Sequence, residues 1–153
     1  MRKKIIEVSS LRKFMESKNF QRVSLKKINS NHFELKAKVN GVKGNFILDT
    51  GASNSCIGSD SIAHFNLDVA ESEVKAAGAG ATNMFTQIAE GYTLDIGDWR
   101  QKKADFVVFD LQHVNEALQT ANADAVNGII GADVLKKSRA VIDYGRNCLY
   151  LKT

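Results

Sequence analysis

Short alternating segments separated by glycine turns dominate this chain of 153 residues. In residues 33–39, FELKAKV, apolar and charged side chains alternate, which predicts a strand with one buried face. An Asn-Gly dipeptide follows and predicts a hairpin turn, after which residues 44–49, GNFILD, return as a second strand. Because the three apolar residues 46–48 are consecutive, we expect that second strand to be covered on both faces.

Helical spacing is confined to short segments. Residues 8–19 place apolar side chains at helical intervals, with Ser9 or Ser10 as the expected cap. Further short helices are predicted within residues 59–68, capped by Ser59 or Ser61, within 111–121, and at about 132–138.

The remaining segments predict further hairpins. These are two strand-like segments around a glycine-alanine tip at 76–85, a hairpin from 92–97 to 104–110 with Trp99 partly exposed, and a final hairpin over 139–152. Many short strands with little helix are typical of a mainly β, closed barrel-like domain. We expect that domain to span residues 31–153, behind a basic N-terminal extension, residues 1–30, that carries a short helix.

Composition is that of an ordinary soluble globular protein, with 44% hydrophobic and 25% charged residues. The formal net charge is +4, and much of the excess lies near the N-terminus. No aromatic residues alternate with those charges as a base-stacking surface requires, so we expect a solvated basic segment and no specific nucleic-acid partner.

Two cysteines are too few for a disulfide framework and are interpreted as reduced thiols. We expect no secretory leader and no membrane span, because no stretch approaches the roughly 18 apolar residues that a span needs. These features favour a cytoplasmic location. The three histidines have no mutual ligand spacing, so neither a metal site nor a cofactor is predicted.

Candidate chemistry centres on residues 46–57, FILDTGASNSCI. Asp49 follows an apolar strand, so we expect a partly desolvated carboxylate at a sharp turn. Asp-Thr-Gly is also an ordinary turn sequence, in which the aspartate bonds its own backbone. About eighty residues downstream, a second apolar pair ends in glycine at residues 129–131.

Together these motifs resemble retropepsin-like aspartic proteases of the bacterial and retrotransposon type. Residues 49–53, DTGAS, are similar to the active-site loop of that family, and residues 128–135, GIIGADVL, to its second landmark and short helix. Residues 140–144 and 149–151 are similar to its closing strands. The similarity covers about residues 32–153 and implies a mainly β fold, the retropepsin-like closed barrel that forms half of a two-domain acid protease.

The resemblance implies a role for each matching residue. Asp49 would be the catalytic carboxylate, with Thr50 bracing the paired loop and Gly51 and Ala52 allowing close approach. The hydrophobic floor beneath that loop would comprise Ile129, Ile130 and Gly131. The segment 76–85 would be the flap over a peptide substrate, with Gly78, Ala79, Gly80, Ala81 and Met84 contacting the substrate.

Aspartic protease chemistry needs two carboxylates that share one proton, and the sequence holds a single Asp-Thr-Gly. The resemblance therefore implies a homodimer that cuts peptide or protein substrates, with one Asp49 from each chain. Pepsin-like relatives often carry serine or threonine after the glycine, where this chain has Ala52, so we expect a less acidic optimum. Retroviral members usually have an arginine where this chain has Ala132, and this change removes a polar tie near the expected interface.

Two other functions stay open. Cys56 and His64 could suggest a thiol protease, although no third orienting group is evident. The domain could also be a catalytically silent retropepsin-like module for binding or dimerisation, in which Asp49 only forms a turn.

Overall fold

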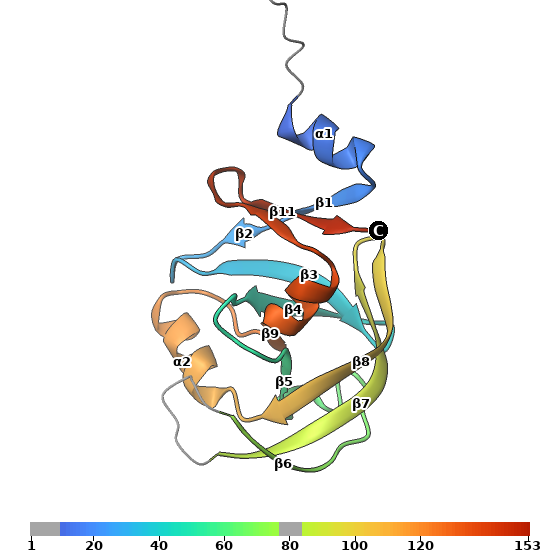
Figure 1. Cartoon of the computed structure of the whole chain (residues 1–153). Coiled ribbons are helices and arrows are strands. Elements are labelled where there is room, and N and C mark those ends of the chain that lie inside the picture. The colour runs from blue at the N-terminus through green and yellow to red at the C-terminus, as the bar shows by residue number, and fades with distance from the viewer. Residues whose placement is uncertain (1–9, 77–83) are drawn as a thin grey trace, which may run out of the picture.

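The computed structural model describes residues 10–76 and 84–153 (Figure 1). Its strands are β1 (Phe20–Ser24), β2 (Lys26–Lys27), β3 (Phe33–Val39), β4 (Val42–Leu48), β5 (Cys56–Gly58), β6 (Ala70–Ala76), β7 (Met84–Ile96), β8 (Trp99–Phe109), β9 (Gly128–Ile130), β10 (Val141–Asp143) and β11 (Cys148–Lys152). Its α-helices are α1 (Leu11–Ser17), α2 (Gln112–Thr120) and α3 (Ala132–Lys137), and single 3-10 turns cover Ser59–Ser61 and Tyr144–Arg146.

Most strands form one sheet that closes on itself. Within the described residues its order is β2-β3-β4-β9-β5-β8-β7-β6, and an additional pairing of β3 with β7 closes the ring. The barrel is therefore built from β3, β4, β9, β5, β8 and β7, with β2 and β6 outside it. This arrangement confirms the mainly β, closed-barrel prediction.

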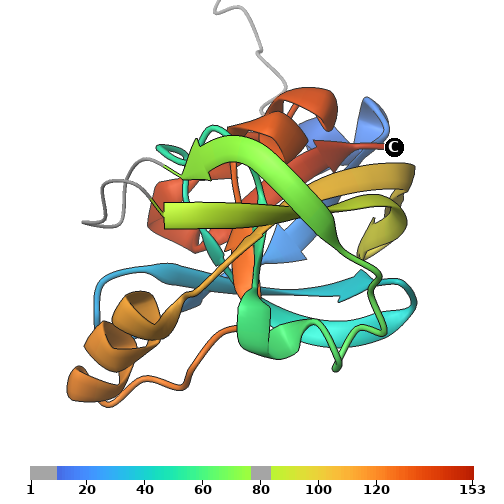
Figure 2. The ribbon, with the colours of Figure 1, turned by 90° about the horizontal axis from the view of Figure 1, so that it is seen from below.

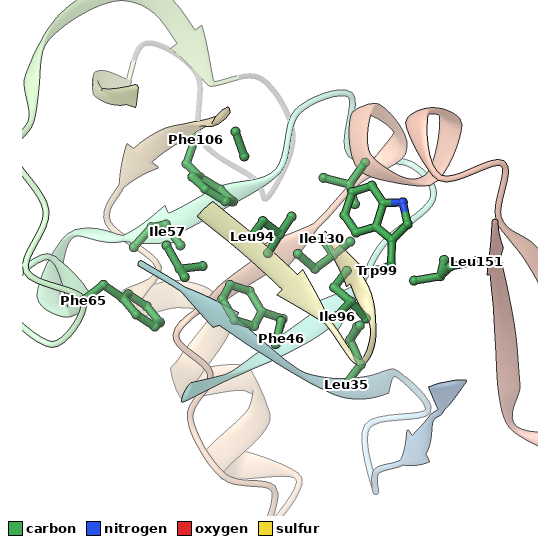
Figure 3. Packing of buried hydrophobic residues seen from close by; sticks show 14 of the residues in the cluster. Leu35, Phe46, Ile57, Phe65, Leu94, Ile96, Trp99, Phe106, Ile130 and Leu151 are labelled. Carbon is green, nitrogen blue, oxygen red and sulfur yellow. The ribbon is translucent and has the colours of Figure 1, made fainter. Parts of the chain in front are cut away.

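The strand that leads to Asp49 is covered on both sides, as its apolar run predicts. Phe46 belongs to the main core together with Phe65 and Ile130, and all three side chains are fully buried (Figure 3). Ile47 points the other way, into a second cluster that includes Leu118 of α2. Each face of β4 is thus anchored by its own apolar cluster, which fixes the end of the strand in space.

Residues 10–28 are packed against the rest of the chain. Ser10 caps α1 by accepting a hydrogen bond from the Lys13 amide at 3.1 Å, as predicted. β1 pairs antiparallel with β11, and β2 pairs with β3. Leu25 lies in the main core. The division between residues 30 and 31 stays a prediction, and residues 20–28 are structurally continuous with the barrel. α1 and α2 lie on opposite sides of that barrel (Figure 1 and Figure 2).

Two local predictions are wrong. Trp99 is only 7% exposed, because this first residue of β8 directs its side chain into the core (Figure 3). The predicted helix over residues 59–68 shrinks to the 3-10 turn Ser59–Ser61, which no side chain caps. Asn66, at φ 54°, takes a left-handed conformation that an α-helix does not admit. The helices in 111–121 and 132–138 and the final hairpin are confirmed.

Candidate active site

The two landmark motifs lie side by side in the barrel. β4 and β9 pair in parallel, with Phe46 opposite Gly128 and Leu48 opposite Ile130. One residue further on, the Asp49 amide donates to the Ile130 carbonyl at 3.0 Å. Sheet pairing therefore places the apolar-apolar-glycine segment directly beside the strand that carries the candidate carboxylate.

Asp49 shapes the turn that follows it. The Gly51 amide donates to Oδ1 of Asp49 at 2.9 Å, and the Ala52 amide donates to the Asp49 carbonyl at 3.2 Å. This pattern is the local side-chain-to-backbone bond of an Asx turn. One carboxylate oxygen is thus held by the turn, and Oδ2 has no hydrogen-bond partner among the described residues.

The expected dry setting of Asp49 is wrong for the single chain. Asp49, Thr50 and Gly51 are exposed and Ala52 is half-buried, whereas Phe46 and Ile47 are buried behind them. The apolar residues 46–48 end with β4. They anchor the start of the turn to the core, and the turn itself, residues 49–52, extends into solvent.

Gly131 allows the active-site loop to lie against the start of α3. A Cβ atom there would approach the Ala52 carbonyl oxygen to 2.6 Å, a distance that side chains do not tolerate. The Ala132 amide donates to that same carbonyl at 2.7 Å. Ile129 and Ile130 are 7% and 0% exposed, in the two clusters that flank β4. The structure thus brings together Asp49 to Ala52 with Ile129 to Gly131.

A hydrogen-bond relay that the sequence reasoning missed ties the loop to α3. Ser55 is fully buried, and both its amide and its hydroxyl donate to Oδ1 of Asp133, at 2.9 and 2.7 Å. The Gly131 amide in turn donates to the Ser55 hydroxyl at 2.8 Å. Asp133 is a first-turn residue of α3, as predicted. The sequence signal that could have indicated it is a serine directly before the apolar pair Cys56-Ile57.

Replacing Ser55 with alanine is expected to destabilise the fold by about 2 kcal/mol, because the Gly131 amide loses its partner and Asp133 loses one donor. Urea unfolding would measure the change. Asp133→Asn keeps an acceptor oxygen and should cost less. The exposed Ser59 provides the matched control, since Ser59→Ala removes a hydroxyl at the surface. Equal midpoints for the Ser55 and Ser59 variants would contradict the relay's role.

Cys56 is placed for packing. It is 2% exposed within the second apolar cluster, and burial raises the pKa of its thiol to about 12. A thiol protease needs a lowered pKa and an accessible sulfur, so this geometry argues against that reading. His64 is exposed, and its Nε2 atom lies 2.8 Å from the Lys43 carbonyl oxygen.

Neither cysteine should react in the folded protein. At pH 8 a thiol with a pKa near 12 is ionised in about one molecule in ten thousand, and Cys148 is also fully buried. Titration with Ellman's reagent should therefore detect no thiol in buffer and both thiols in denaturing urea. Rapid reaction of one thiol in buffer would overturn this prediction.

Other predicted features are described only in part. Gly78, Ala79, Gly80 and Ala81 lie outside the described residues, and of Met84 the structure describes only the backbone at the start of β7. β6 and β7, which flank that segment, pair antiparallel as expected.

Within residues 10–76 and 84–153, no cluster of three or more histidine, cysteine or acidic side chains could hold a metal ion. Nor does that part of the chain contain a helix long and apolar enough to cross a membrane.

Comparisons with known proteins support the resemblance to aspartic proteases that the two motifs suggest. Residues 35–134 match the sequence model of a family described as aspartyl protease. No curated protein sequence matches the chain.

Solved structures share the fold. A retropepsin-like aspartic protease from Rickettsia conorii superposes with a TM-score of 0.58 at 21% identity, covering 86% of this chain and 91% of that one. The retroviral protease-like domain of Ddi1 from Leishmania major gives 0.52 at 20% identity, with coverages of 77% and 86%.

The inhibitor-bound EIAV protease also gives 0.52, at 19% identity, covering 71% of this chain and 89% of that one. At these identities the likeness shows the fold alone, and the family match extends over most of the barrel. With Asp49-Thr50-Gly51 held beside Ile129-Ile130-Gly131 in that barrel, the chain belongs to the retropepsin-like aspartyl protease family.

Proposed function

We propose that this chain is an aspartic endopeptidase that hydrolyses extended polypeptides as a homodimer. The observation that carries the proposal is the exposed turn of Asp49 and Thr50, anchored from behind by β4 and β9. Among the described residues, the Thr50 hydroxyl and Oδ2 of Asp49 have no hydrogen-bond partner. Both groups are thus available to a second copy of the turn.

The chemistry requires a pair of carboxylates. Like charges about 3 Å apart do not both ionise, so two Asp49 side chains would share one proton. The ionised carboxylate would take a proton from a water molecule as its oxygen attacks the scissile carbonyl carbon. The protonated carboxyl would give its proton to the carbonyl oxygen. The tetrahedral intermediate would collapse when the carboxyl that took the water proton gives it to the amide nitrogen and the C–N bond breaks. A hydroxyl proton of the intermediate would return to the other carboxylate, which restores the pair that shares one proton.

A two-fold axis would supply the second carboxylate. In an isologous dimer the same residues of both chains meet at the axis, so one motif per chain is sufficient. The Ser55–Asp133 relay also bears on the alternative of a silent binding module. The missing arginine at Ala132, which removes a polar tie near the expected interface, is a reason to favour that alternative. The relay provides a different polar tie for the same loop, within one chain.

Sedimentation combined with peptide cleavage tests the proposal. We expect a dimer whose cleavage of a peptide library is inhibited by pepstatin, and whose specific activity falls on dilution below the dimer dissociation constant. A stable monomer that cleaves nothing between roughly pH 3 and 7, where a shared-proton pair operates, would refute it.

Ala52 is expected to influence the pH dependence of cleavage. In Ala52→Ser, a hydroxyl next to the turn would donate to the ionised carboxylates and stabilise them, so the acidic limb of the pH–rate profile should move to lower pH. The measurement is kcat/KM against pH for both proteins. An unchanged acidic limb would show that residue 52 does not set the optimum.

A further inference from the structure

A basic hollow lies on the outer face of the barrel, away from the candidate active site. Its volume is about 700 Å³, and it is bounded by β3, β4 and the β7–β8 hairpin. The residues that line it are Lys36, Ala37, Lys38, Lys43, Asp95, Gly97, Asp98 and Arg100. Lys43 and Asp49 are at opposite ends of β4, so about 20 Å of strand separates the Lys43 end of this hollow from the carboxylate.

One of the two carboxylates that line the hollow, Asp95, is already neutralised. Arg100 binds both oxygens of Asp95, through Nε at 2.5 Å and Nη2 at 3.2 Å. Lys36, Lys38 and Lys43 are exposed, and none of them forms a salt bridge within the described part of the chain. Three cations against the carboxylate of Asp98 therefore leave a positive surface.

The three lysines are close neighbours on one sheet face. Lys38 is directly opposite Lys43 in the β3–β4 register, and Lys36 is two residues along β3 on the same face. Like charges directly opposite one another destabilise a sheet, so an anion between them would remove a repulsion.

A smaller groove continues from the hollow along β3. It has a volume of about 280 Å³, and Lys36 lines both spaces. Lys26 lines the groove as well, where it is opposite the nearly buried Glu34 in the β2–β3 register. We name the hollow and this groove together the basic trench.

One wall of the trench is held rigidly. Gln21 of β1 donates to the Ile96 carbonyl at 3.3 Å and accepts from the Asp98 amide at 2.6 Å, so it clamps the β7–β8 turn. Gly97 in that turn has φ 57°, and a Cβ atom there would collide with the Gln21 amide group. The turn is thereby fixed beside the lysines before any partner arrives.

We infer that the basic trench binds an extended acidic segment of a polypeptide. Alternate side chains of an extended peptide repeat about every 6.7 Å, which matches the spacing of Lys36 and Lys38 along β3. Among the described residues, no aromatic side chain lines either space to provide a stacking platform for a single-stranded nucleic acid. As an exosite, the trench would favour substrates with an acidic stretch beside the cleaved segment, and only this last statement rests on the proposed function.

Binding to a catalytically silenced protein tests the inference separately from cleavage. The Asp49→Asn variant is titrated with a fluorescein-labelled peptide of alternating glutamate and serine, and anisotropy is recorded at low and high salt. We expect saturable binding that weakens as salt rises, and an affinity loss of about tenfold when Lys36, Lys38 and Lys43 are changed to glutamate.

The matched control places the same charge change elsewhere, on the exposed Lys13, Lys18 and Lys136. An equal loss in this control would overturn the inference, because net charge alone would explain binding. Tighter binding of a thymidine oligonucleotide of equal charge would also overturn it.

In the active protein, joining the acidic segment to a cleavable peptide should lower KM without changing kcat. Binding without any cleavage would contradict the proposed function, and the inference that the basic trench binds acidic segments would still hold.

Discussion

Asp49→Asn is expected to lower kcat/KM for peptide cleavage by about ten-thousandfold and to leave the fold unchanged. Asparagine cannot accept and return a proton at the pH of catalysis, so general acid–base assistance is lost. Its Oδ1 can still accept the Gly51 amide, which donates to Asp49 at 2.9 Å, and the side chain is exposed. Thermal melting should therefore be nearly identical for the two proteins while hydrolysis of a fluorogenic peptide disappears.

Asp124→Asn provides the control, because it removes the same charge from another exposed position. Mixing wild-type and Asp49→Asn chains in increasing proportion gives a sharper test. If both carboxylates of a dimer are needed, activity should follow the square of the wild-type fraction. A linear dependence would show that each chain acts alone, and full activity of the variant would exclude Asp49 from catalysis.

The central arrangement was predictable from sequence because local patterns encode it. Three consecutive apolar residues before Asp49 required cover on both faces, and the two clusters around Phe46 and Ile47 provide it. The segment 128–131 carries an apolar pair, and its position beside the Asp49 strand was implied by the family resemblance and is confirmed by the pairing of β4 with β9. The hairpin turns were predictable because asparagine and glycine admit positive φ angles.

Features that depend on long-range contact were not predictable in this way. The pairing of β1 with β11 joins residues near the two ends of the described chain, and no local pattern marks it. The Ser55–Asp133 relay links residues 78 positions apart. Exposure of Asp49 was misjudged because hydrophobicity of the preceding strand reports the burial of that strand and not of the turn beyond it.

Gly128→Ala is expected to destabilise the fold by about 3 kcal/mol, which corresponds to a fall in melting temperature of about 10 °C. Gly128 begins β9, which lies between β4 and β5. A Cβ atom there would approach the Cys56 carbonyl oxygen to 2.2 Å and the Phe46 ring to 2.8 Å. The carbonyl belongs to the backbone of β5, so relief requires that β9 separate from its neighbour.

Gly145→Ala is the matched comparison, because a Cβ atom there meets nothing within 4 Å and its φ angle is not positive. That variant should change stability by less than about 0.5 kcal/mol. Since β9 pairs with β4 and its Ile130 carbonyl accepts from the Asp49 amide, any Gly128→Ala protein that still folds should also lose cleavage activity at temperatures well below its melting point. Equal melting temperatures for the two variants would mean that β9 has room to shift. In that case close packing of Gly128 would not be what holds the active-site loop in position.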